Sequence, residues 1–454
     1  MLYRKAWQEL EKWHAESSRK ALLIMGARQI GKTTLVREFA RKRYGCFAEL
    51  NFLEDPDAGE IFAGALDANS IVEGITAHLR VPLRPHDTLV LLDEVQECPA
   101  ARTAIKFLVE DGRFDYIETG SLLGVKTAQV ASYPVGFERH VQMFPLDFEE
   151  FCLAVGVQPQ TIELLRACFE HGEPVSGSIH QTMLQLFQTY CVVGGMPEVV
   201  QRYVDTHDIA QVVGLQEDLL ALYRLDIEKY AEKGDKPKIR AIFDALPSQL
   251  DEKNRRFVLA DLSKSARQNR YESSFLWLAD AGVALPCYNV TEPVAPLASN
   301  GKRNLFKLFM GDTGLLCAAS MGNAQLEILR GNLEVNMGAI AENVVAQELR
   351  AHGFDLHYFN NKREGEVDFV VQDGSCVLPI EVKSGEDWRR HHALSNVLGV
   401  REWGLDHAYV LCKGNVGQDG AVTYLPLYMV MFLAPQELSE HALFEVDLSA
   451  LVSG

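Results

Sequence analysis

The sequence has no long apolar run, no paired cysteine motif and no surplus of basic residues. No uninterrupted apolar stretch approaches the roughly 18 residues that a membrane helix needs, so we expect no membrane contact. The nine cysteines are scattered without a C-x-x-C pair, which argues against a disulfide framework and a zinc knuckle. The N-terminal residues 1–5 lead into a charged amphipathic pattern that is not typical of a signal peptide. These absences predict a cytoplasmic protein.

Positive charge is scarce as well. The chain has 44 Lys and Arg residues against 62 Asp and Glu residues, for a net charge of −18. This balance argues against a globally basic nucleic-acid binder and leaves room only for local basic patches. No Gly- or Ser-rich linker divides the 454 residues, and a domain usually takes roughly 150 residues. We therefore expect about three domains that pack together, 1–146, 147–297 and 298–454.

The strongest motif is a glycine-rich turn between the apolar run 21–25 and a helical stretch from Thr34 onwards. It reads Gly26, Ala27, Arg28, Gln29, Ile30, Gly31, Lys32 and Thr33. A strand, then G-x-x-x-x-G-K-[ST], then a helix is the context of a phosphate-binding loop. Its backbone N–H groups are expected to face phosphate oxygens, with Lys32 on the β- and γ-phosphates and Thr33 on Mg²⁺. The sequence thus predicts a nucleotide site for ATP and Mg²⁺.

Two further candidate strands end in polar residues. Residues 89–92 are apolar and lead into Asp93 and Glu94, which is typical of a central strand that delivers Asp93 to the Mg²⁺ shell. The run 115–118 ends near Thr119 and Ser121, either of which fits a polar sensor beside the γ-phosphate, although a plain strand-to-turn signal would look the same. Strands that alternate with helical stretches predict an α/β fold with a parallel sheet covered on both faces.

Several segments resemble a prokaryotic family of AAA-type P-loop ATPases that carry a C-terminal domain of unknown function. The resemblance spans nearly the whole chain. It implies an ATPase core of the ASCE class, in which Glu94 polarises the attacking water, then a helical and winged-helix-like middle and a nuclease-like C-terminal domain. The segments that carry it are 26–35, 92–96 with 98–99, 119–123, 144–151, 194–198 and 307–316.

Two arginines are candidates for stabilising the transferred phosphate. The family usually carries an arginine before Phe144, and here Arg139 holds that position. An arginine that reaches the γ-phosphate, in its own chain or from a neighbour in a homo-oligomer, would stabilise the transition state. Arg28 within the loop is the second candidate. The alternative for either residue is an ordinary surface arginine.

The region from 147 to about 300 is mostly helical in pattern. Within it, Lys264, Arg267 and Arg270 fall near one face of a helical stretch, and a second helix follows from Phe275. A helix-turn-helix or winged helix with a basic face has this pattern, and so does a solvated surface helix. The first interpretation makes DNA a partner.

The C-terminal third resembles the PD-(D/E)xK nuclease fold. Glu342 lies on an amphipathic helix, Asp368 on a strand, and Glu381 and Lys383 share one face of the next strand. We expect Asp368 and Glu381 to hold Mg²⁺, Glu342 to add a ligand or orient a water, and Lys383 to act on the attacking water or on phosphate. The basic and aromatic run 388–392 could contact a phosphate backbone.

These features predict an ATP-hydrolysing protein that couples ATP turnover to DNA binding or processing through its nuclease-like domain. The alternative is a nucleotide-dependent switch or scaffold that acts on a protein partner and whose nuclease-like domain is catalytically inactive.

Overall fold

The first sheet is formed by five parallel strands in the order β2-β3-β4-β1-β5. The computed structural model describes residues 2–16, 19–121, 134–251, 256–262, 270–321, 325–330, 337–436 and 446. The strands are β1 (Ala21–Met25), β2 (Cys46–Asn51), β3 (Thr88–Asp93), β4 (Asp115–Gly120) and β5 (Glu138–Gln142). Because β4 lies between β1 and β3, the carboxyl ends of these three strands meet at one edge. The expected parallel α/β core is confirmed.

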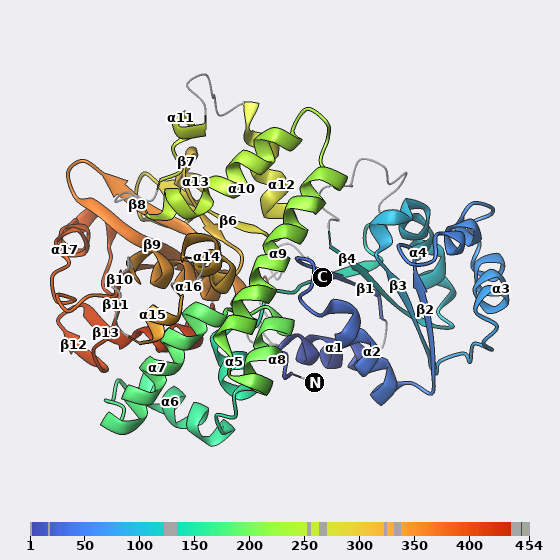
Figure 1. Ribbon diagram of the computed structural model, residues 1–454, viewed down its shortest axis with the longest axis horizontal. Coiled ribbons are helices and arrows are strands. Elements are labelled where there is room, and N and C mark those ends of the chain that lie inside the picture. Colours follow the sequence, from blue (N-terminus) through green and yellow to red (C-terminus); the bar gives the residue numbers. More distant parts are fainter. Residues whose placement is uncertain are drawn as a thin grey trace, which may run out of the picture.

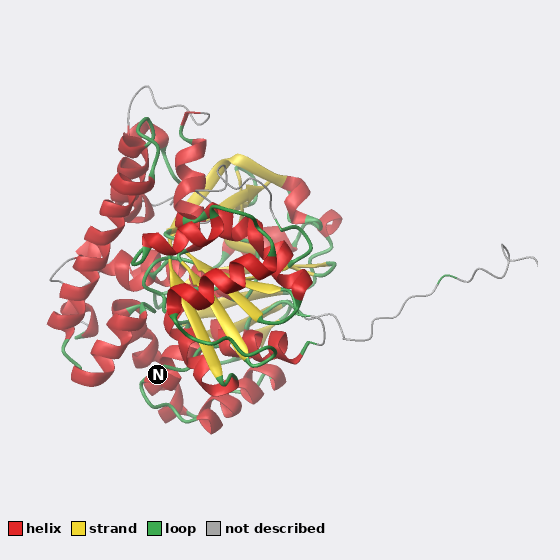
Figure 2. Ribbon diagram, turned by 90° about the vertical axis from the view of Figure 1, so that its right-hand side faces the viewer, coloured by secondary structure: helices red, strands yellow, loops and turns green. Residues whose placement is uncertain are grey.

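Helices cover both faces of this sheet (Figures 1 and 2). Alternate residues of β1 enter two different apolar clusters. Leu22 and Ile24 pack with the first pair of helices (α1 and α2), whereas Ala21 and Leu23 pack with the second pair (α3 and α4). Trp13 of α1 is fully buried in the first cluster. The first pair is α1 (Ala6–Ala15) and α2 (Lys32–Arg43), and the second is α3 (Ala68–Leu79) and α4 (Pro99–Asp111).

The middle of the chain is a set of helices, of which α8 and α9 run between the two sheets (Figure 1). Residues 194–196 interrupt it between α7 and α8, as the glycines there predict. The helices are α5 (Phe148–Ala154), α6 (Pro159–His171), α7 (Gly177–Val193), α8 (Pro197–Thr206), α9 (Ile209–Tyr230), α10 (Lys236–Asp251), α11 (Leu259–Leu262) and α12 (Glu272–Asp280).

The expected winged helix stays a prediction. Helices α10 to α12 are followed by a two-stranded hairpin, which is the element order of a winged helix, and both strands belong to a larger sheet. Lys264 and Arg267 of the expected basic face lie outside the described residues. The exposed side chains of α12 include two acidic ones, Glu272 and Asp280, which do not suit a phosphate backbone.

The second sheet has eight strands in the order β12-β13-β11-β10-β9-β8-β6-β7. Its hairpin β6–β7 is antiparallel and spans the boundary expected at 297/298, so strands from both sides of that boundary pair with each other. The pattern of residues 291–296 indicates a loop, and the structure makes this loop a connection within one sheet. The strands are β6 (Ala284–Val290), β7 (Gly301–Met310), β8 (His357–Asn361), β9 (Gly365–Asp373), β10 (Cys376–Lys383), β11 (Ala408–Cys412), β12 (Gly417–Asp419) and β13 (Val422–Pro426).

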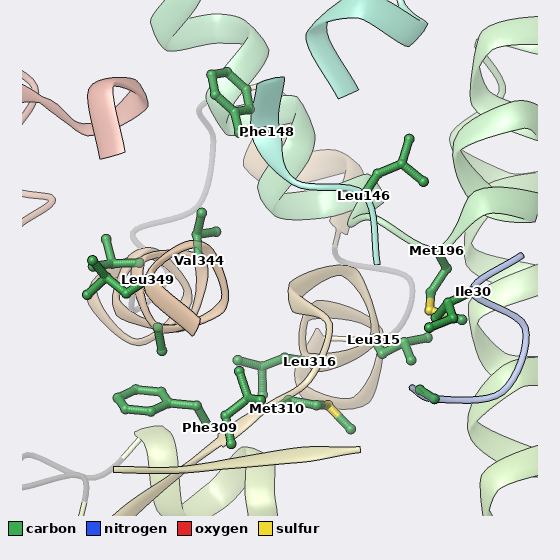
Figure 3. Close-up of a cluster of buried hydrophobic side chains, with 14 of the residues drawn as sticks. Ile30, Leu146, Phe148, Met196, Phe309, Met310, Leu315, Leu316, Val344 and Leu349 are labelled. Carbon is green, nitrogen blue, oxygen red and sulfur yellow. The ribbon is translucent and has the colours of Figure 1, made fainter. Parts of the chain in front are cut away.

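The two sheets share one apolar cluster with the middle helices. It contains Leu22 of β1, Phe187 of α7, Leu315 of α14 and Val344 of α16, and part of it is drawn in Figure 3. No helix among the described residues is both long and apolar enough to cross a bilayer. The remaining helices are α13 (Leu297–Asn300), α14 (Thr313–Met321), α15 (Gln325–Leu329), α16 (Met337–Ala351) and α17 (His392–Leu398), with 3₁₀ turns Pro56–Phe62, Val95–Glu97, Arg401–Trp403 and Leu427–Phe432.

Candidate nucleotide-binding site

The glycine-rich loop joins the carboxyl end of β1 to the N-terminus of α2. Gly26 and Gly31 have φ angles of 146° and 87°, a region that residues with a Cβ rarely adopt. A Cβ on Gly26 would also stand 2.2 Å from the carbonyl oxygen of Met143. Glycine is therefore required at position 26 both for the backbone conformation and for the close approach of Met143, which follows the neighbouring strand β5.

Lys32 is folded back onto the loop. Its Nζ donates to the carbonyl oxygens of Gly26 (3.0 Å) and Ala27 (2.7 Å) and to Ser121 Oγ (3.0 Å). Burial lowers the pKa of Lys32 to about 8, although the carboxylates of Glu94 and Asp93 oppose this shift. Phosphate oxygens are better partners for an ammonium group than carbonyl oxygens are. The side chain is thus held next to the place where phosphates bind in such loops.

Asp93 ends β3 as a buried carboxylate with three side-chain donors. Thr33 Oγ1 lies 3.0 and 3.1 Å from its two oxygens, Asn51 Nδ2 donates to Oδ2 at 2.9 Å, and Thr119 donates to Oδ1. Burial raises the pKa of Asp93. A threonine hydroxyl beside a carboxylate offers the hard oxygen ligands that Mg²⁺ prefers. Thr33 and Asp93 therefore fit the expected Mg²⁺, and Asn51, which the sequence analysis missed, orients Asp93.

Glu94 and Ser121 complete the polar edge. Ser121 Oγ accepts from Lys32 and lies 3.4 Å from Glu94 Oε1, to which it donates, and Gln96 Nε2 donates to the other oxygen of Glu94. Glu94 has a φ of 53°, so its backbone turns sharply after the strand. Of the two sensor candidates, Ser121 bridges Lys32 and Glu94, whereas Thr119 contacts Asp93.

The two arginine candidates are both engaged elsewhere. Arg28 pairs with Asp226 of α9, and its guanidinium carbon lies 5.6 Å from the ring centre of Tyr230. Arg139 forms ion pairs with Glu9 (2.8 Å) and Glu16 (2.6 Å).

The place of Arg139 on its strand also separates it from the loop. In the pairing of β5 with β1, Arg139 stands opposite Leu22, near the start of β1, whereas the loop follows the end of β1. The structure therefore does not bring Arg139 to the nucleotide site of its own chain. A contribution from a neighbouring chain in a homo-oligomer stays a prediction.

Segments that are distant in the sequence pack against the phosphate-binding loop. The side chains of Ile30, Met196 and Leu315 lie close together in the buried cluster (Figure 3). A Cβ on Gly282 would stand 2.9 Å from the backbone nitrogen of Ala27, so the turn after α12 touches the loop directly. Met196 and Leu315 belong to segments that carry the family resemblance, which indicates that these segments form the support of the loop.

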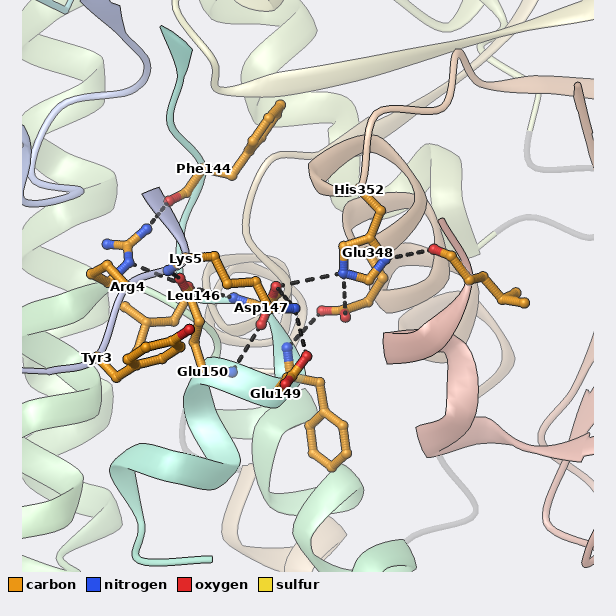
Figure 4. Close-up of polar contacts among 12 residues, drawn as sticks. Tyr3, Arg4, Lys5, Phe144, Leu146, Asp147, Glu149, Glu150, Glu348 and His352 are labelled. Atoms are coloured by element: carbon orange, nitrogen blue, oxygen red, sulfur yellow. Dashed lines mark hydrogen bonds and ion pairs between the residues drawn. The ribbon is translucent and has the colours of Figure 1, made fainter. Parts of the chain in front are cut away.

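An N-terminal arginine joins the loop to a buried polar cluster (Figure 4). Arg4 donates to the carbonyl oxygens of Ile30 (2.8 Å) and Phe144 (2.6 Å) and forms an ion pair with Glu150 (3.2 Å). The sequence analysis missed this residue, because its reach of more than 100 positions has no local signal.

The same cluster continues to α16. Lys5 Nζ lies 2.7 Å from Asp147, and Asp147 lies 3.5 Å from His352 Nε2. Glu348 Oε1 accepts from the backbone N–H of Phe148 at 2.8 Å. A chain of polar contacts therefore runs from the phosphate-binding loop to a helix that packs on the C-terminal sheet (Figure 4).

The four C-terminal candidates are also brought together, but around a different centre. Asp368 Oδ2 accepts from the backbone N–H of Val382 at 2.9 Å, and Lys383 Nζ lies 2.7 Å from Glu381 Oε1. Glu342 approaches from α16. The ammonium group of Lys307, which the sequence analysis did not consider, forms ion pairs with Glu342, Glu366 and Asp368.

This arrangement does not fit the Mg²⁺ expected at Asp368 and Glu381. Within the described ranges, no group of three or more His, Cys, Asp or Glu side chains is arranged to hold a metal ion. Burial, and secondly the charge of Asp368, raise the pKa of Glu381 to about 8. We therefore derive no metal-dependent step at this second site.

Three family models match separate stretches of the chain. Residues 18–152 match the model of an AAA domain family, and residues 184–326 and 337–429 match two domains of unknown function, DUF8612 and DUF4143. The DUF8612 match crosses position 297, as the β6–β7 hairpin does. A search of curated proteins finds no match.

Several solved structures are similar to the chain at low sequence identity. A Walker-type ATPase of Pyrococcus abyssi is 14% identical, with 71% of this chain and 96% of that chain covered and a TM-score of 0.41. Aeropyrum pernix ORC1 in complex with DNA is 13% identical (72% and 94%, TM-score 0.28), and Thermotoga maritima RuvB is 14% identical (62% and 85%, TM-score 0.29). With its matched AAA domain and its loop, Lys32 and Asp93 in place, the part of the chain at residues 18–152 is an AAA-type P-loop ATPase domain.

Proposed function

We propose that the protein uses ATP hydrolysis at the loop to change how its C-terminal part holds DNA. The backbone N–H groups of the loop and Lys32 bind the phosphates, Thr33 and Asp93 hold Mg²⁺, and Glu94 orients the attacking water. A Mg²⁺ ion held by Thr33 and Asp93 would offset the negative charge of the phosphates. Ser121, in contact with both Lys32 and Glu94, senses the terminal phosphate.

The observation that carries the coupling is the packing of the loop against the rest of the chain. Lys32 donates to Gly26 and Ala27, and it must leave these carbonyl oxygens when it turns to a phosphate. Ala27 is in contact with Gly282, and the adjacent Arg28 is paired with Asp226. A change in the conformation of the loop therefore acts directly on α9 and on the turn between α12 and β6.

The DNA-binding part of the proposal is supported by exposed basic residues beyond β10. Arg389 and Arg390 are exposed, and the guanidinium of Arg389 lies 4.9 Å from the ring centre of Trp388. Arginine beside an aromatic ring suits both phosphate and base contacts. Because the whole chain carries −18 charges, such binding is expected to be local and to weaken steeply with salt.

A second candidate is a nucleotide-dependent switch whose partner is a protein. The specific observation in its favour is the buried lysine among the C-terminal carboxylates, which removes the reason to expect DNA cleavage there. The acidic exposed residues of α12, Glu272 and Asp280, favour the same alternative. In this case the C-terminal sheet serves as a docking platform.

The test measures ATP hydrolysis and DNA binding by the full chain. We expect duplex DNA to raise the hydrolysis rate, and the anisotropy of labelled DNA to differ between the ADP state and a state with a non-hydrolysable ATP analogue. Charge reversal in an Arg389→Glu/Arg390→Glu variant should remove both effects. Arg363→Glu is the matched control, because Arg363 is exposed in the same domain but lies in another turn. Hydrolysis that ignores DNA, together with no DNA binding in either state, would refute the DNA proposal in favour of the protein-partnered switch.

A further inference from the structure

The C-terminal carboxylates surround a fully buried lysine. Lys307 lies on β7, has no exposed surface, and extends over the ring of Tyr358 with Nζ 5.0 Å from the ring centre. In the sheet order, β6 and β8 separate β7 from β9. Its ammonium group nevertheless ends beside carboxylates of β9 and α16.

Three carboxylates converge on this ammonium group. Nζ lies 2.8 Å from Glu366 Oε1, 3.8 Å from Glu342 Oε2 and 3.9 Å from Asp368 Oδ1. All three contacts are ion pairs, and the contact with Glu366 is the shortest. Two of these three carboxylates, Glu342 and Asp368, are the ones that the nuclease resemblance assigns to catalysis or to a metal.

Most of the neighbouring carboxylate oxygens have partners within the chain, whereas the buried Oε2 of Glu381 has no hydrogen-bond partner among the described residues. The second oxygen of Asp368 accepts from the Val382 backbone, and Glu381 is paired with Lys383. Asn360 donates to the second oxygen of Glu366. The positive charge of the cluster is therefore supplied by the chain, through Lys307 and Lys383.

A lysine in this position excludes a metal ion for physical reasons. A lysine is almost never fully buried unless it is paired with acidic groups, so Lys307 depends on the carboxylates that a metal would need. Mg²⁺ requires oxygens at about 2.0–2.1 Å, and the point on which these three carboxylates converge already holds the ammonium group. Two cations forced into one buried site repel each other strongly.

We propose that Lys307 is the resident cation of this cluster, that the cluster binds no divalent metal ion, and that removal of the ammonium group turns it into a metal site. The C-terminal domain then does not cleave phosphodiesters by a metal-dependent route. This inference goes beyond the proposed function and holds whether the partner of the C-terminal part is DNA or a protein.

The experiment locates bound metal in the nucleotide-free full chain. Fe²⁺ with ascorbate and peroxide cleaves the backbone close to the place where the iron is bound, and mass spectrometry of the fragments identifies that place. Cleavage near 33 and 93 reports the nucleotide site, so it is distinguished from cleavage between 366 and 383. The variants are Lys307→Met and, as a matched control on the same strand, Lys302→Met, which changes an exposed lysine.

We expect no cleavage between 366 and 383 in the parent protein or in Lys302→Met, and clear cleavage there in Lys307→Met. Mn²⁺ binding followed by electron paramagnetic resonance should rise by one ion per chain in Lys307→Met and return to the parent value in Lys307→Met/Asp368→Asn. Cleavage between 366 and 383 in the parent protein would overturn the proposal, and so would a folded Lys307→Met that gains no metal. If Lys307→Met does not fold, the cleavage experiment on the parent protein is sufficient by itself. Iron bound in the cluster of the parent protein overturns the proposal, and the absence of iron from that cluster supports it.

Discussion

The contact between Gly282 and the phosphate-binding loop can be tested with a pair of glycine substitutions. Gly282 and Gly112 both have a φ of 70°, and both follow the end of a helix. A Cβ on Gly112 would meet nothing within 4 Å, whereas a Cβ on Gly282 would stand 2.9 Å from the nitrogen and 3.2 Å from the Cβ of Ala27. The two alanine variants therefore share the backbone strain and differ in the clash with the loop.

The expected magnitudes follow from these two terms. A non-glycine residue in the left-handed region costs about 1–2 kcal/mol, and both variants carry this cost. Excess volume in a packed site costs roughly 1–3 kcal/mol more, and only Gly282→Ala carries this second cost. The effect of alanine on the unfolded chain is the same in both and cancels.

Two assays check this reasoning. Urea denaturation should show Gly282→Ala less stable than Gly112→Ala by about 1–3 kcal/mol. Titration with a fluorescent ATP analogue should show ATP affinity reduced about tenfold in Gly282→Ala, which corresponds to about 1.4 kcal/mol, and unchanged in Gly112→Ala. Equal stability and equal ATP affinity of the two variants would refute the claim that the turn after α12 supports the loop.

Three further predictions concern the site and its connections. Asn51→Ala should raise the Mg²⁺ concentration for half-maximal hydrolysis by roughly 10–100-fold, because Asn51 orients Asp93. The control Asn69→Ala, on an exposed part of α3, should leave this concentration unaltered. The same Mg²⁺ concentration in both variants and in the parent protein would contradict the role of Asn51. Arg4→Met should destabilise the fold by about 3–5 kcal/mol in urea denaturation, because Glu150 stays buried without the arginine that pairs with it. The double variant Arg4→Met/Glu150→Gln should recover part of this lost stability. A double variant that is no more stable than Arg4→Met would contradict the pairing of Arg4 with Glu150. Burial raises the pKa of Glu348 to about 7, so the native state binds more protons than the unfolded state between about pH 4.5 and 7, and the contribution of this group to stability falls as the pH rises through that window. Because Glu348→Gln lacks this contribution, the stability of the variant relative to the parent protein should rise by about 1–2 kcal/mol from pH 5 to pH 7. A stability difference that stays constant with pH would speak against the raised pKa.

The parts predicted correctly from the sequence are those with short-range signals. The strand, loop and helix around Lys32 and the strand that ends in Asp93 are contiguous motifs, and the parallel sheet follows from the alternation of strands and helices. Asn51 meets Asp93 because β2 pairs with β3 in a register that aligns these two residues. Sequence spacing carries no information about that register.

The parts that were missed depend on contacts between distant segments. Lys307 reaches the carboxylates only because the second sheet brings β7, β9 and α16 together. In the sequence it precedes Glu342 by 35 positions and reads as part of a strand. The expected boundary at 297/298 rested on a proline-containing loop, and tertiary pairing places that loop inside the β6–β7 hairpin.

The measurement that tests the central claim most directly is steady-state ATP hydrolysis by the full chain and by Lys32→Ala, with and without Mg²⁺. Lys20→Ala, which changes an exposed lysine just before β1, is the matched control. We predict Mg²⁺-dependent hydrolysis by the parent protein and by Lys20→Ala, and its loss in Lys32→Ala while the fold is retained. Equal hydrolysis by Lys32→Ala and the parent protein would contradict the account, because the loop would then not be the site of the reaction.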